Sequence, residues 1–178
     1  INSHVNSLTS MGHYDQALTP AQSVLETSER TLEPEHPSTL SSVNNLAVLL
    51  ESKGDYEDAE SPFQRALETS ERTLGPEHPD TLTSVNNLAF LLKSKGNYEE
   101  AEPLFHSAME FCERTLGSQH PDTAVNKFAL WKCRHQIGEN EIPVDELRKA
   151  YQLIAKEDGH DHSSTMVTDA YMYELLSE

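Results

Sequence analysis

Residues 43–126 contain one 42-residue sequence twice in succession, and this repeat limits the fold more than any other feature of the chain. Between VNNLAVLL…PDTLTS at 43–84 and VNNLAFLL…PDTAVN at 85–126, 26 of 42 positions are identical. A repeat of this length predicts stacked copies of one supersecondary unit, because a single copy cannot bury its apolar face alone. Weaker copies flank the pair. We therefore expect one repeat domain over residues 1–178, with units at about 1–42, 43–84, 85–126 and 127–162.

Each unit is predicted to form two helices that pack against each other. Leu46 and Leu50 share one face at helical spacing, and Gly54 is placed to end this helix in a left-handed conformation. A second apolar stripe covers residues 56–74 and ends at Gly75, which is followed by a proline that cannot continue the helix. The pattern therefore predicts an all-α chain of helical pairs.

A His-Pro-Asp-Thr or His-Pro-Ser-Thr loop separates successive units. In the loop at 78–81, we expect Asp80 or Thr81 to cap the exposed backbone N–H groups of the next helix. The loop histidine recurs once per repeat, and successive repeats lie about 10 Å apart, too far for shared metal ligation. We therefore interpret three histidines as structural loop residues, namely His36, His78 and His120.

The turn Gly54-Asp55-Tyr56, followed by Ala59 and then by Phe63, resembles the signature of the tetratricopeptide repeat. The long LGPEHPDT loop and the NNLA helix resemble the variety found in kinesin light chain and nephrocystin-3. This resemblance implies a right-handed superhelical solenoid of antiparallel helix pairs, whose first helices line a concave groove. A HEAT-like helical pair is the alternative for a repeat of this length.

The fourth unit departs from the pattern. Its VNKFA sequence at 125–129 matches VNNLA only after a two-residue shift, which leaves open the face that Trp131 takes. We expect the second helix of this unit to begin at Pro143, since proline suits the first helical position. A further helix at about 165–177 is expected to cover the end of the array.

The charge of the chain argues against two classes of partner. The chain carries 13 Lys and Arg against 30 Asp and Glu, a formal net charge of −17. Nucleic acids and anionic membranes require a basic surface, so neither is an expected partner.

Two cysteines are too few for a disulfide framework, and we expect reduced thiols in a cytoplasmic protein. The chain starts in mid-repeat without Met, so we expect a piece of a longer protein whose open end favours end-to-end self-association.

The sequence contains no recognisable catalytic motif. It has no phosphate-binding glycine loop, no Gly-x-Ser-x-Gly elbow and no His-Glu-x-x-His helix. We therefore predict a non-catalytic protein without a cofactor. One group of residues has a metal-like composition, but no second pair has a known ligand spacing, and we predict no metal site. This group comprises Cys133, His135, His160 and His162.

Two asparagine pairs in the middle of helices are the main candidates for binding. Asparagine is a mediocre helix former, and an amide can bond the backbone of an extended peptide through both its donor and its acceptor. The alternative, which the sequence leaves open, is that these amides bond neighbouring repeats. With the resemblance, they predict a peptide-binding groove lined by Asn44, Asn45, Val48, Ser52, Asn86, Asn87, Phe90, Ser94 and Lys127.

These features together predict a protein–protein interaction scaffold that binds a peptide segment or a helix in its groove. The alternative is an intramolecular regulatory or sensor arm of a larger signalling protein, such as an ATPase or a protease. In both cases the negative charge favours a neutral or basic partner segment, because opposite charge raises the rate of encounter.

Overall fold

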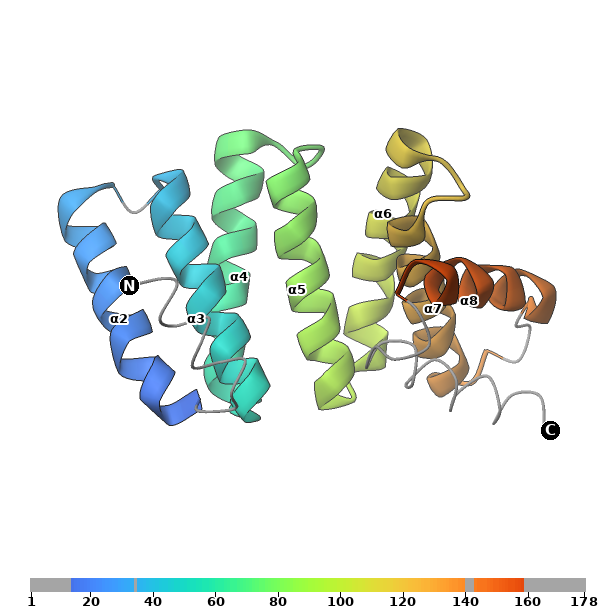
Figure 1. Cartoon of the computed structure of the whole chain (residues 1–178), viewed down its shortest axis with the longest axis horizontal. Coiled ribbons are helices and arrows are strands. Elements are labelled where there is room, and N and C mark those ends of the chain that lie inside the picture. Colours follow the sequence, from blue (N-terminus) through green and yellow to red (C-terminus); the bar gives the residue numbers. More distant parts are fainter. Residues whose placement is uncertain (1–13, 34, 140–142, 159–178) are drawn as a thin grey trace. The chain divides into compact units, whose positions relative to one another are not determined.

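The computed structural model describes residues 14–33, 35–139 and 143–158, which form helices joined by short loops (Figure 1). No strand occurs in these ranges, and successive helices pack in pairs, as the repeat predicted. The helices are α2 (Tyr14–Thr31), α3 (Pro37–Lys53), α4 (Tyr56–Leu74), α5 (Pro79–Lys95), α6 (Tyr98–Leu116), α7 (Pro121–Gln136) and α8 (Val144–Asp158). They belong to two compact units, Ile1–Asn97 and Tyr98–Glu178, which are described separately below.

The described first helices of the repeats, α3, α5 and α7, each have a histidine as N-cap. In α5, the backbone N–H of Asp80 donates to Nδ1 of His78 at 3.1 Å, and Pro79 follows the cap as the first helical residue. Proline costs nothing there, because the first helical N–H has no partner inside the helix. The same arrangement recurs with His36 and His120, at 3.1 and 3.2 Å. The predicted structural role of the three histidines is therefore confirmed.

The prediction that Asp80 or Thr81 caps α5 is wrong. Asp80 provides the backbone N–H that is capped, and its side chain stays in solvent. The hydroxyl of Thr81 points back into the loop and donates to the backbone oxygen of Gly75 at 2.8 Å. Because Thr81 is fully buried and hydrogen-bonded, it anchors the end of α4 to the start of α5.

Glycine ends the first helices, as predicted. Gly54 has φ 92° and Gly96 has φ 82°, in the left-handed region that a side chain disfavours. The N–H of Asp55 then returns to the backbone oxygen of Leu50 at 2.9 Å, and this bond closes the last turn of α3. The α3–α4 connection is thereby reduced to two residues, which holds the two helices antiparallel.

Small and large side chains alternate along the buried faces of α4 and α6. Ala59 and Ala66 of α4 are completely buried, and so is Phe63 between them in the sequence. Alanine permits the close approach of neighbouring helices, while the phenyl ring fills the space beside it. Ala101 and Phe105 of α6 repeat the pattern in the second unit.

Helix α7 has the same register as α5. Its N-cap His120 lies 42 residues after His78, and Gly138, with φ 90°, lies 42 residues after Gly96. The two-residue shift between VNKFA and VNNLA is therefore wrong, since both ends of the helix stay in place. The likeness of the two sequences is local and does not reflect equivalent positions.

Asn126 shows what this register means for a side chain. It occupies the place of Ser84, which shares a buried hydroxyl contact of 3.3 Å with Ser70 of α4. In α7, the Asn126 amide instead donates to Sγ of Cys112 at 3.6 Å. One buried polar pair has thus replaced another between the same two elements of the repeat.

The register also settles the face of Trp131. Its equivalent in α5 is Ala89, which is fully buried, and the indole of Trp131 likewise turns inward, to an exposure of 8%. It packs against Leu147 and Ala150 of α8, with Phe128 beside it. Helix α8 begins at Val144, one residue after the expected Pro143, whose backbone oxygen accepts a bond from the Leu147 N–H at 3.0 Å.

Two further expectations concern residues outside the described ranges. These are the first helix of the first repeat, before residue 14, and the covering helix at 165–177. The repeat boundaries and the single domain also stay predictions. Among the described helices, none has both the length and the apolar character that crossing a membrane requires.

Replacing His78 by alanine should lower the free energy of unfolding by about 1 kcal/mol, because the Asp80 N–H loses its acceptor. His78→Asn should retain most of the stability, since asparagine is a good N-cap residue. Urea denaturation at neutral pH, followed by circular dichroism, measures both. If the asparagine variant loses as much as the alanine variant, packing of the imidazole matters rather than capping.

Candidate peptide-binding surface

Helices α3 and α5 lie in contact within the first unit, and each also packs against α4. Because they are equivalent helices of successive repeats, residues 42 positions apart form neighbouring rows. The accessible rows are formed by Asn45 with Asn87, Val48 with Phe90, and Ser52 with Ser94. We call this set of six side chains the α3–α5 face.

Exposure differs along the α3–α5 face. Asn45, Ser52 and Ser94 are exposed, whereas Asn87 and Phe90 are half-buried. Val48 has an exposure of 39%, which is high for a large apolar side chain in the described part of the chain. The face therefore offers amides, hydroxyls and apolar surface together, which suits a peptide with both backbone and side-chain contacts.

Asn44 and Asn86 are oriented differently from their neighbours. Both are half-buried, and their Oδ1 atoms are enclosed without a hydrogen-bond partner among the described residues. An unsatisfied buried acceptor costs free energy, and each such group in a folded protein calls for an explanation. In the same ranges, no bond from these oxygens to a neighbouring repeat is present, so they give no support to the stack-organising alternative.

A hollow of about 240 Å³ lies at one end of the α3–α5 face. Its wall includes Asn44 and Asn45, together with the hydroxyl-bearing Thr83 of α5. The hollow is large enough for a side chain of a bound segment, and its lining favours a polar one. The full lining is Pro37, Leu40, Ser41, Asn44, Asn45, Ser70, Leu74, Asp80 and Thr83.

The other end of the face contains two charged residues, Lys93 and Glu51, and the sequence alone had not singled out Glu51. Lys93 places its Nζ 4.5 Å from the centroid of the Phe90 ring, a cation–π contact. Glu51 of α3 is half-buried, and burial raises the pKa of its carboxyl, while the nearby Lys93 charge partly opposes this rise. The signal was available, because Glu51 and Lys93 lie 42 positions apart and three residues after Val48 and Phe90.

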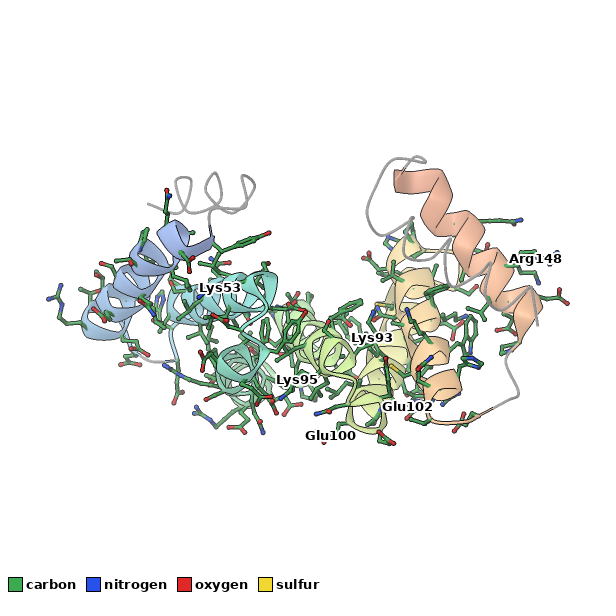
Figure 2. The ribbon with its side chains drawn as sticks, turned by 90° about the horizontal axis from the view of Figure 1, so that it is seen from below. Lys53, Lys93, Lys95, Glu100, Glu102 and Arg148 are labelled. Atoms are coloured by element: carbon green, nitrogen blue, oxygen red, sulfur yellow. The ribbon has the colours of Figure 1, made fainter. Side chains whose placement is uncertain are left out.

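Lys93 and Lys95 leave α5 on different sides (Figure 2). Lys95 bonds to Glu60 of α4 and lies 3.1 Å from Glu57. These carboxylates therefore hold α5 to α4. Since Lys95 is engaged away from the α3–α5 face, Lys93 is the lysine of this helix that a ligand on the face would meet.

Lys127, the remaining predicted groove residue, belongs to the second unit. It lies at the position of Val85 in α5 and not at that of Asn87, to which the shifted alignment assigned it. Its Nζ donates to the Glu113 carboxylate of α6 at 2.8 Å. Lys127 and Trp131 line a cavity of about 190 Å³ between α7 and α8. The residue that corresponds to Phe90 in α7 is Lys132.

The group of residues with a metal-like composition lies only partly within the described ranges. Cys133 is fully buried and His135 is half-buried on α7, whereas His160 and His162 lie outside the described ranges. Within the described ranges, no three His, Cys, Asp or Glu side chains converge as metal ligands would. The absence of a metal site therefore stays a prediction for the whole chain.

Comparison with known proteins identifies the repeat. The sequence profile of the tetratricopeptide repeat matches residues 2–38, 39–80 and 81–122, which is more than half of the chain. The chain belongs to the tetratricopeptide repeat family. Such repeats typically act as scaffolds for protein–protein interaction. Comparison with curated protein sequences gives no match.

Solved structures of kinesin light chain-like repeat proteins share the fold. The nearly identical TPR-like repeats of a Podosopora anserina protein described as a kinesin light chain give a TM-score of 0.78 at 24% identity, covering 96% of this chain and 81% of that chain. A glutamine-to-methionine variant of that protein gives 0.79 at 24% identity, with coverages of 96% and 80%. BtubC (BKLC) from P. vanneervenii gives 0.69 at 19% identity, with coverages of 97% and 70%.

Glu51→Gln should stabilise the protein near neutral pH. Because the pKa of Glu51 is raised in the folded chain, its charged form is less favourable there than in the unfolded chain. This cost is present above the folded pKa and absent below the ordinary glutamate value of about 4.3. The stability difference between variant and wild type should therefore shrink as pH falls toward about 4. Urea unfolding over this range measures it, and a variant that is less stable at neutral pH contradicts the prediction.

Proposed function

We propose that this protein is a non-catalytic scaffold that binds an extended peptide segment of a partner protein along the α3–α5 face. The observation that carries the proposal is the row of amides, Asn45 with Asn87, at the accessible surface of two adjacent helices. Amides that donate and accept can follow a peptide backbone with little dependence on its sequence. Val48 and Phe90 would add apolar contacts for its side chains.

The buried acceptors Asn44 Oδ1 and Asn86 Oδ1 support the same proposal. A small rotation of either amide would let its oxygen accept a bond from a ligand N–H, which would relieve the cost of leaving it unsatisfied. The hollow beside Asn44 and Asn45 would hold one side chain of the segment. The proposal therefore gives these amides a role that internal packing does not.

The partner segment can belong to another protein or to the same polypeptide as this chain. In the second case the array is the regulatory arm of a larger signalling protein, and the same α3–α5 face is its contact surface. A cytoplasmic location, the absence of enzymatic activity and end-to-end self-association stay predictions.

Replacing both Asn45 and Asn87 by alanine should weaken peptide binding about tenfold or more, because two backbone contacts are lost from the same row. Helicity should not fall, since alanine is the better helix former. Peptides would be selected from a random phage-displayed library on the wild-type protein, then measured against both proteins by calorimetry.

The matched control carries Ser61→Ala and Gln64→Ala, which change two exposed polar side chains of α4. These substitutions should leave binding unchanged. Loss of helicity in the Asn45→Ala, Asn87→Ala protein would instead favour the stack-organising role of the asparagines. Selected peptides that bind all three proteins equally would move the binding surface elsewhere.

A further inference from the structure

A cation–π pair on α5, formed by Lys93 and Phe90, lies within electrostatic reach of the partly buried Glu51 carboxyl on α3. The Lys93 ammonium lies over the Phe90 ring at 4.5 Å and within the field of the Glu51 carboxylate. All three side chains are half-buried, and they lie where α3 and α5 run beside each other. An aromatic face and a partly desolvated carboxylate together bind a cation more strongly than either alone.

We propose that a lysine or arginine of the partner segment displaces Lys93 and binds between the Glu51 carboxylate and the Phe90 ring. The inference rests on the proposed function and specifies its ligand, which is a basic peptide segment. Lys93 then acts as an intramolecular stand-in that keeps the site occupied until the ligand binds.

The displacement of Lys93 is feasible because its stem is flexible and its helix position suits a cation elsewhere. Lys93 lies in the last turn of α5, where the partial negative charge of the helix end stabilises a positive side chain. Its ammonium can therefore rotate toward solvent and keep its favourable interaction with the helix end. The ligand cation then takes over the contacts with the Phe90 ring and the Glu51 carboxylate.

The surroundings also favour a long basic side chain over an acidic one. Val48, at an exposure of 39%, lies three residues before Glu51 on the same face of α3 and offers apolar surface for the aliphatic stem of lysine or arginine. An acidic side chain would instead be repelled by the Glu51 carboxylate. Partial burial of this carboxylate leaves less water to screen the repulsion. The net charge of −17 attracts basic segments over a longer range.

The test starts from the same random phage-displayed library. Peptides selected on the wild-type protein should share a lysine or arginine, and replacing that residue by methionine should weaken binding about tenfold. Glu51→Gln should weaken binding of the selected peptide by a similar factor. It should leave binding of the methionine-substituted peptide unchanged. Lys93→Met should raise the affinity for the selected peptide about threefold or more, because Lys93 no longer competes for the site.

Glu68→Gln is the matched control, since it removes one exposed carboxylate from α4 and changes the net charge by the same amount. It should leave the affinity within about twofold of wild type at physiological salt. If Glu51→Gln and Glu68→Gln weaken binding equally, only the overall charge acts and the site proposal is overturned.

Two outcomes separate this inference from the proposed function. Peptides that require Asn45 and Asn87 but share no basic residue, or that are enriched in acidic residues, would overturn the cation site and leave the peptide-binding surface intact. Peptides that do not require Asn45 and Asn87 at all would contradict the binding surface itself. Weaker binding by Lys93→Met would also overturn the inference, because it would make Lys93 a ligand contact.

Discussion

The hydrogen bond from a backbone N–H to the loop histidine determines where the first helices α3, α5 and α7 begin, and the rest of the repeat depends on this point. The bond occurs at His36, His78 and His120 with nearly the same length. A helix that starts at a fixed residue presents a fixed set of side chains to the next helix, because each residue turns the chain by about 100°. The buried threonine of the loop holds the preceding helix to the same point.

The constancy of the helix ends explains how the interior can vary. In α7 the cap and the terminal glycine match those of α5, yet Ala89 is replaced by Trp131 and the Ser84 hydroxyl by the Asn126 amide. The larger ring is accommodated against α8, where a cavity of about 190 Å³ lies next to it. Tight backbone constraints at both ends thus permit repacking between them without a change of register.

The α3–α5 face combines features that a purely structural surface would not need. The two asparagine oxygens beside it are buried without a bond among the described residues, and Val48 remains substantially exposed. At its other end, Glu51 is partly removed from water and Lys93 is stacked on an aromatic ring. The unbonded oxygens, the exposed valine and the partly buried carboxylate each cost stability on their own. Binding of an extended basic segment is a function that would use all of them.

The sequence by itself determined the helical pairs, their period, the glycine at the end of each first helix and the asparagines on the α3–α5 face. These features follow from local backbone preferences and from a periodicity that can be counted along the chain. Local preference also suggested the wrong N-cap, because aspartate and threonine are better caps on average than the histidine that occupies the site.

Only the tertiary structure decided the face of Trp131, the place of Lys127 and the effect of the Lys93 charge on the Glu51 carboxyl. Glu51 and Lys93 lie on different helices, so no local rule links them, although their separation equals the repeat. The likeness of VNKFA to VNNLA suggested a wrong alignment, because it compared five residue types and ignored their distance from the ends of the helix. Contacts between helices depend on register, and register is set here by the helix ends, of which the histidine N-cap became apparent only in the folded chain.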